Sequence, residues 1–154
     1  MTTHSLQLQT LEDLSPVCKK MAPLLKPGMI LLLEGPIGVG KTTFVRTLLQ
    51  TLGVKGKIQS PTYTLINTYH AEFTVHHMDL YRIDTENDLA HLDLDRYFED
   101  QESILLIEWA DKLGAFHPIN ALKLRWDYEK DNSRQVQLDT EDSSYNHLIS
   151  ALTK

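Results

Sequence analysis

Residues 34–43 read EGPIGVGKTT, and this glycine-rich stretch decides the fold class. It contains Gly35, Gly38, Gly40, Lys41 and Thr42 and satisfies the Walker A pattern, G-x-x-x-x-G-K-[ST]. Glycines let such a loop turn tightly and bring its backbone N–H groups onto phosphate oxygens. Lys41 can then reach the terminal phosphates of a nucleotide, and the Thr42 hydroxyl can be a ligand of Mg²⁺.

The residues on either side of the loop support this interpretation. Residues 29–33 form a continuous apolar run, which is typical of a strand buried on both faces. Residues 42–52 are predicted to form an amphipathic helix that ends at Gly53. Because a Walker A loop joins a buried strand to a helix, a glycine-rich turn that carries Lys-Thr by chance is the less favoured alternative.

The rest of the chain predicts further helices and strands. Apolar spacing predicts a helix over residues 11–25, with Pro16 in its first turn, and we also expect a short polar helix over residues 84–92 and a short helix over residues 148–152. Residue types and alternation predict strands over residues 62–69, 73–80, 104–107, 122–126 and 136–138, the first two as a hairpin. We expect one α/β domain over residues 1–154 with the P-loop NTPase fold: a mostly parallel sheet, helices on both faces and an antiparallel hairpin.

The composition limits the classes of function. Of the 154 residues, 42% are hydrophobic, as in folded globular proteins, and no apolar run approaches the ~18 residues of a membrane span. The first ten residues lack the pattern of a signal peptide, and Cys18 is the only cysteine, so we expect no membrane partner, no internal disulfide and a cytoplasmic location. A net charge of −6, from 15 basic and 21 acidic residues, argues against broad docking on nucleic acid.

Two acidic residues are candidates for the neighbourhood of the Mg²⁺. Asp79 ends FTVHHMD and Glu108 ends SILLIE, and acids at the carboxyl ends of sheet strands face the ligand crevice. Glu108 follows four apolar residues, as a Walker B acid does. We expect one acid to bind the metal and the other to position water. For each acid taken alone, the alternative is that it lies at the end of its strand without a role in the site. The base is expected to be adenine, because the guanine-specific N-K-x-D string is absent.

Four segments, in this order and at this spacing, resemble a known family: LLLEGPIGVGKTTFVRTLLQTLG (31–53), SPTYTLINTY (60–69), HHMDLYRID (76–84) and LLIEWADKLG (105–114). They resemble the TsaE family of small bacterial ATPases in tRNA threonylcarbamoyladenosine biosynthesis. The resemblance implies ATP and Mg²⁺ as ligands and the TsaB and TsaD proteins as partners. It further implies that TsaD transfers the threonylcarbamoyl group to adenosine 37 of tRNAs that read ANN codons, so that tRNA is met only through the complex.

The resemblance also implies roles for individual residues. Catalytic positions fall on Lys41, Asp79 and Glu108, and the metal ligands on Thr42 and Glu108. Nucleotide contacts fall on Thr10, Gly35, Pro36, Ile37, Gly38, Val39, Gly40, Lys41, Thr42, Thr43 and Arg134. A switch and partner-docking region falls on Ser60, Pro61, Thr62, Thr64, Arg82 and Trp109.

Some residues depart from the family pattern. Pro36-Ile37 replaces the usual Asp-Leu, and Val39 replaces a usual alanine. These positions contribute backbone more than side chain, although Pro36 removes one N–H donor. Glu-Trp-Ala-Asp at residues 108–111 replaces the usual Glu-Trp-Pro-Glu, so this departure lies in the loop after Trp109 and leaves the metal acid Glu108 unchanged.

Several alternatives stay open at this point. The SPTYT segment could be an ordinary turn into a strand, and Trp109 could be a core aromatic. His76 and His77 point to opposite faces of a strand, so core or crevice histidines are favoured over a shared metal. The chain could instead be a small P-loop kinase acting on a metabolite or nucleoside, although its five arginines do not cluster as a lid requires. A nucleotide-binding regulatory module without turnover is the third alternative.

Overall fold

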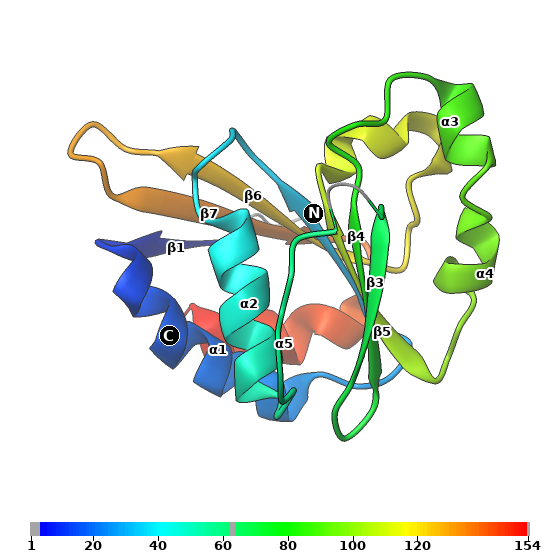
Figure 1. Cartoon of the computed structure of the whole chain (residues 1–154). Helices are drawn as coiled ribbons and strands as arrows, with labels where there is room; N and C mark the ends of the chain where they lie inside the picture. Colours follow the sequence, from blue (N-terminus) through cyan, green and yellow to red (C-terminus); the bar gives the residue numbers. More distant parts are fainter. Residues whose placement is uncertain (1–3, 62–63, 154) are drawn as a thin grey trace.

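A computed structural model describes residues 4–61 and 64–153, and Figure 1 shows one twisted sheet with helices packed on it. The seven strands lie in the order β1-β7-β6-β2-β5-β4-β3. Their bounds are β1 His4–Leu8, β2 Ile30–Glu34, β3 Ile66–His70, β4 Thr74–Asp79, β5 Ser103–Glu108, β6 Leu122–Tyr128 and β7 Arg134–Thr140.

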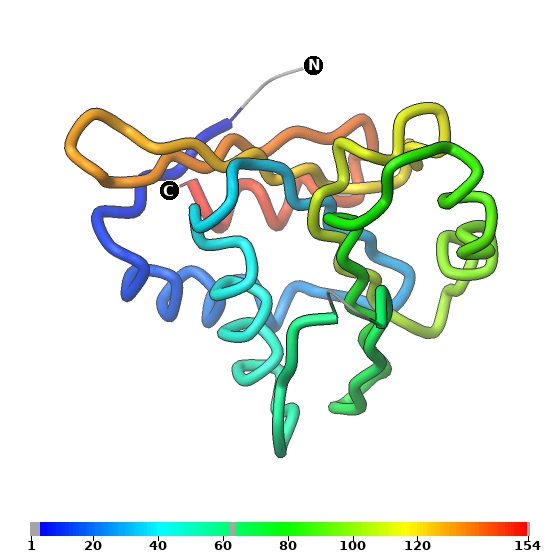
Figure 2. The backbone as a smooth tube through the Cα atoms, turned by 45° about the horizontal axis from the view of Figure 1, so that its top comes forward, coloured from blue at the N-terminus to red at the C-terminus, as the bar shows by residue number. Residues whose placement is uncertain are grey.

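The centre of the sheet is parallel and both of its edges are antiparallel. Strands β6, β2, β5 and β4 pair in parallel, as expected for apolar strands joined by helical crossovers. The predicted hairpin is present as β3 and β4, although β3 begins at Ile66 rather than at residue 62. At the other edge, β7 returns antiparallel to β6, and β1, which the sequence did not predict, adds outside β7 (Figure 2).

The helices cover both faces of the sheet, as predicted. On one face lie α1 (Leu14–Met21), α2 (Lys41–Thr51) and α5 (Asn146–Leu152). The other face carries α3 (Glu86–Ala90), α4 (Leu94–Phe98) and the 3₁₀ segment η3 (Ala110–Phe116). Short 3₁₀ turns complete the chain: η1 (Leu11–Asp13), η2 (Ala22–Leu24) and η4 (Ser143–Tyr145). No helix among residues 4–61 and 64–153 has the length and apolarity that crossing a lipid bilayer demands.

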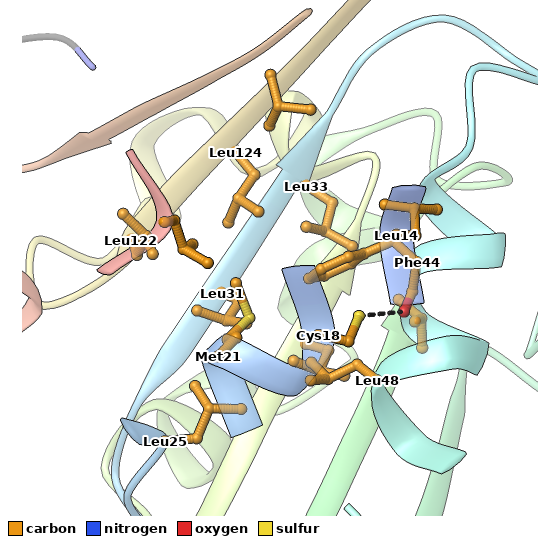
Figure 3. Close-up of a cluster of buried hydrophobic side chains, with 14 of the residues drawn as sticks. Leu14, Cys18, Met21, Leu25, Leu31, Leu33, Phe44, Leu48, Leu122 and Leu124 are labelled. Carbon is orange, nitrogen blue, oxygen red and sulfur yellow. Dashed lines mark hydrogen bonds between the residues drawn. The ribbon is translucent and has the colours of Figure 1, made fainter. Parts of the chain in front are cut away.

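Strand β2 divides the core into two clusters, because successive side chains of a strand point to opposite faces. Leu31 and Leu33 pack with α1, α2 and α5, and Figure 3 shows this cluster with Leu14 and Phe44 against them. Ile30 and Leu32 pack on the other face with residues of β4, β5 and η3. Because β2 is a central strand and is buried along its whole length, the loop that follows it starts from the packed middle of the sheet.

The acidic stretch after β4 is more structured than predicted. The helix expected over residues 84–92 is the shorter α3, whose N-cap Thr85 accepts a hydrogen bond from the Asp88 N–H. Asp93 adopts a left-handed conformation (φ 54°), and a second short helix, α4, follows it. Leu89 and Leu94 are buried in the core cluster on this face, so the stretch packs on the sheet.

Candidate functional site

The loop between β2 and α2 packs closely against the rest of the protein at two of its glycines. Gly35 has φ 146°, and a Cβ there would lie 2.6 Å from the Trp126 carbonyl oxygen. Gly40 has φ 126°, and a Cβ there would lie 2.7 Å from the Leu11 side chain. These two Walker A glycines are therefore required by the fit of the loop to β6 and to the N-terminal segment, as well as by phosphate binding.

Beside this loop the structure forms a pocket of about 280 Å³. Its walls come from the start of α2, the ends of β4 and β5, and the segment before β3. They include these predicted site residues: Ile37, Gly38, Gly40, Lys41, Thr42, Thr43, Ser60, Asp79, Glu108 and Trp109. Tyr81 also lines it, whereas Pro36 and Arg82 do not. A larger hollow of about 440 Å³ beside β2, β6 and β7 is lined by four acids, Glu34, Asp111, Asp139 and Glu141, and by one lysine, Lys123, which is paired with Glu34, so it disfavours phosphates.

Lys41 is buried in this pocket, with 4% of its surface exposed. Its Nζ donates a hydrogen bond to the Gly35 carbonyl oxygen and lies 3.6 Å from the centroid of the Trp109 ring, a cation–π contact. Burial lowers the pKa of the ammonium group, and the carboxylates of Glu108, Asp111 and Asp79 partly oppose that shift. The cation is thus held on a carbonyl and an aromatic face, which a phosphate can replace.

Glu108 has both carboxylate oxygens engaged. The Thr42 hydroxyl donates to Oε1 at 2.7 Å, and Nε2 of His77 lies 2.6 Å from Oε2. A hydroxyl and a carboxylate oxygen side by side are ligand types that Mg²⁺ prefers, and Mg²⁺ takes its other ligands from water and phosphates. Within residues 4–61 and 64–153 there is no cluster of three or more His, Cys, Asp or Glu side chains that could hold a metal ion.

Asp79 lies directly beside Glu108 on the neighbouring strand. The two are Cα partners at the carboxyl ends of the parallel strands β4 and β5. Asp79 is 5% exposed, and its Oδ1 accepts a hydrogen bond from the Tyr81 N–H at 2.9 Å. Both strand-end acids that the sequence singled out therefore line one pocket.

His76 and His77 point to opposite faces, as predicted. His76 contacts Thr68 and Asp100 on the side of β4 away from the pocket. His77 is almost fully buried against Glu108, a contact that the sequence interpretation missed. Its position two residues before Asp79 was a usable signal, because residues i and i+2 of a strand share a face.

Of the two outlying residues predicted to contact nucleotide, Arg134 contacts the loop and Thr10 lies next to a residue that does, and neither lines the pocket. The Nε of Arg134 donates to the Val39 carbonyl oxygen at 3.2 Å. Leu8 pairs with Arg134 across β1 and β7, which brings the N-terminal segment alongside (Figure 2). Thr10 is the N-cap of η1 and is exposed, next to Leu11, whose side chain lies against Gly40.

Of the predicted switch region, Ser60 and Trp109 line the pocket. Pro61 is buried, and the exposed Thr64 donates to the Asn67 side chain at 3.0 Å. Thr62 lies outside the described residues. Arg82 is exposed in the turn that follows β4.

Trp109 joins this region to the loop. It has a left-handed backbone (φ 58°) directly after Glu108, and its ring lies 5.1 Å from that of Tyr81. It therefore contacts both Lys41 and Tyr81 and lines the pocket, while it also packs against the core cluster on the α3 and α4 face.

Comparisons with known proteins agree with this geometry. The family model described as "Threonylcarbamoyl adenosine biosynthesis protein TsaE" matches residues 8–136. The tRNA threonylcarbamoyladenosine biosynthesis protein TsaE of Bacillus subtilis (strain 168) is 33% identical over 144 residues, covering 93% of this chain and 89% of that protein. The protein of the same name from Haemophilus influenzae is 34% identical over 141 residues, covering 88% of each chain. The crystal structure of B. subtilis YdiB superposes with a TM-score of 0.82 at 28% identity, covering 98% of this chain and 94% of that one. This chain therefore belongs to the TsaE family.

Proposed function

We propose that this protein is the ATPase required for threonylcarbamoyladenosine modification at position 37 of tRNAs that read ANN codons, acting in the cytoplasm with a TsaB–TsaD transferase complex. The observation that carries the proposal is the convergence of Lys41, Thr42, Asp79 and Glu108 on one pocket beside a Walker A loop. Membership of the TsaE family supports the assignment to tRNA modification, because the relatives carry that process in their names.

The residues of the pocket have distinct roles in this proposal. Backbone N–H groups of the loop bind the phosphates of ATP, and Lys41 exchanges the Gly35 carbonyl for phosphate oxygens. Thr42 and Glu108 hold the Mg²⁺, which neutralises the charge of the phosphates when it is bound. Asp79 orders the attacking water or couples hydrolysis to the switch segment.

The ATP cycle is proposed to control when this protein assembles with TsaB and TsaD and when it is released. P-loop sites without a positioned arginine are typically slow, and a partner that supplies one can raise the rate by ~10³–10⁵. The segment of residues 60–64 would order around the γ-phosphate and form a docking surface with Trp109 and Arg82. By linkage, ATP then strengthens partner binding by the factor by which partners strengthen ATP binding.

The experiment is a reconstitution with purified TsaB, TsaD and unmodified tRNA. We expect ATP, and not ADP, to support capture of the two partners, and the complete mixture to form threonylcarbamoyladenosine over many turnovers. Trp109→Ala should keep ATP binding and lose stimulation of the modification, whereas Lys20→Ala, at an exposed site on α1, should retain both. A small acceptor that becomes phosphorylated would identify a metabolite kinase instead, and ATP binding without turnover in the complete mixture would identify a regulatory module.

A further inference from the structure

Two residues of the β6–β7 hairpin hold consecutive carbonyl groups of the phosphate-binding loop. The Tyr128 hydroxyl donates to the Gly38 carbonyl oxygen at 2.8 Å, and Nε of Arg134 donates to the Val39 carbonyl oxygen at 3.2 Å. Tyr128 and Arg134 are Cα partners across the hairpin, so their side chains share one face. The Arg134 guanidinium lies 5.2 Å from the centroid of the Tyr128 ring, and the two side chains therefore approach the loop as a contacting pair.

A hydrogen bond to each of these carbonyl groups also fixes the direction of the N–H in the same peptide group. In a trans peptide the C=O and N–H groups point in opposite directions, and the loop peptides are trans. The Gly38 carbonyl points to Tyr128, so the Val39 N–H points away from the hairpin. The Val39 carbonyl points to Arg134, and the Gly40 N–H is oriented in the same way. The hairpin thus directs two N–H groups of the Walker A loop.

The loop needs this support, because its own backbone is permissive. Gly38 and Gly40 have φ of 76° and 126°, in a region where glycine lacks the steric limits of other residues. The Val39 N–H makes only a 3.4 Å contact with the Pro36 carbonyl oxygen, longer than the usual 2.7–3.2 Å of such bonds. Breaking this long contact therefore costs little free energy when the Val39 N–H turns to a phosphate oxygen.

We propose that Tyr128, together with Arg134, is a positioning residue that orients the Val39 and Gly40 amides for phosphate before a nucleotide arrives. The inference rests on the proposed function, because it concerns the same ATP site. If the loop is already ordered in the nucleotide-free protein, binding does not have to reduce the conformational entropy of the loop. The affinity for the phosphate chain should therefore be higher. Tyr128 is 47% exposed, and the competing role for its ring is stacking on the base.

The test compares ATP with inorganic tripolyphosphate, which has no base, by calorimetry. Tyr128→Phe removes the hydroxyl and keeps the ring. We expect it to weaken both ligands by the same factor, about threefold to tenfold, and to speed hydrogen exchange of the Val39 and Gly40 amides in the nucleotide-free protein. Lys130→Ala, at an exposed site in the same hairpin turn, is the matched control and should leave both affinities unchanged.

The outcomes separate the two proposals. Equal affinities in Tyr128→Phe and the parent protein would overturn the positioning role, as would a loss confined to ATP. If the parent protein binds neither ATP nor tripolyphosphate, the proposed ATPase function fails first. A matched loss for both ligands, with thermal unfolding unchanged, supports the inference.

Discussion

The Nε2 of His77 lies 2.6 Å from Oε2 of Glu108, and the two side chains are 1% and 2% exposed. His77 belongs to β4, whereas Thr42, which donates to the other oxygen of Glu108, belongs to α2. The carboxylate is therefore held from both sides of the crevice. Its orientation depends on the pairing of β4 with β5 as much as on the Walker A loop.

We predict that His77→Ala reduces the gain in ATP affinity that Mg²⁺ provides by about tenfold, because a hydrogen bond to a charged group contributes about 1.5–3 kcal/mol. His77→Gln keeps a donor and should recover most of that gain. The measurement is an ATP titration with Mg²⁺ and with EDTA. An equal Mg²⁺ effect in His77→Ala and the parent protein would show that Glu108 does not need this partner.

Removal of the loop lysine should abolish most nucleotide binding. In Lys41→Ala the phosphates lose a charged contact inside a largely dry pocket, so ATP affinity should fall at least tenfold, from a loss of about 1.5–3 kcal/mol or more. Calorimetry with ATP measures this, with Lys20→Ala as the exposed control. Near-normal affinity in Lys41→Ala would contradict the assignment of the loop.

Trp109 should report on nucleotide binding directly. The Nζ of Lys41 lies 3.6 Å from its ring, and we expect that contact to break when Lys41 turns to the phosphates. Addition of ATP should therefore change the tryptophan emission of the parent protein. Trp109→Phe removes the responding ring and Lys41→Ala removes the cation that contacts it, so each variant should lose the change in emission. The second tryptophan, Trp126, is buried and stays as a constant background. A signal that survives in Trp109→Phe would place the movement elsewhere.

The two strand-end acids should separate binding from turnover. Glu108→Ala should weaken Mg²⁺-dependent ATP binding or turnover, because it removes a metal ligand. Asp79→Ala should lower kcat by about 10²-fold or more with little effect on ATP affinity, if Asp79 orders the water or couples the switch. Both are measured as steady-state ATP turnover with TsaB and TsaD present. Normal turnover in Asp79→Ala would refute that role.

Cys18 should be inert in the folded protein. Its side chain is fully buried between α1 and α2, with its thiol near the Phe44 carbonyl oxygen (Figure 3), and burial raises its pKa from 9.0 to about 12. At pH 8 a thiol reagent should label it only as fast as the protein unfolds. Immediate labelling of the native protein would contradict this burial.

The same shift predicts how stability changes in alkali. Below pH 9 the thiol is protonated in the folded and unfolded chains alike, so the buried thiol makes its full contribution to the free energy of unfolding. Between pH 9 and pH 12 the unfolded chain ionises first, so the free energy of unfolding should fall as pH rises. Cys18→Ala should show a shallower fall over that window in denaturant titrations, and an identical fall would assign it to other groups, Tyr145 among them.

The loop, its flanking strand and helix, and the acids at the ends of two strands could be predicted because each depends on residues close together in the chain. The proximity of Asp79 and Glu108 could be predicted from one rule, that parallel strands have their carboxyl ends on the same side of the sheet. The family and the fold class are confirmed, whereas the roles of the site residues stay predictions.

The features that escaped prediction depend on partners far along the chain. Strand β1 is only partly buried and has a short pattern, and it forms because β7 offers an edge 126 or more residues later. The contacts of Tyr128 and Arg134 with the loop join residues about 90 positions apart. No local pattern of residue types encodes such contacts, because they follow from the order of strands in the sheet.

The pairing of β1 with β7 also bears on when the protein becomes competent during its synthesis. His4 is translated long before its partner Leu138, so β1 cannot pair with β7 until β7 has emerged from the ribosome. The Walker A loop is made early, but Tyr128 and Arg134 reach it only after the hairpin has emerged. A nascent chain that stops before residue 134 therefore carries the complete phosphate-binding motif without β7, and it should bind ATP more weakly than a chain that includes the β6–β7 hairpin.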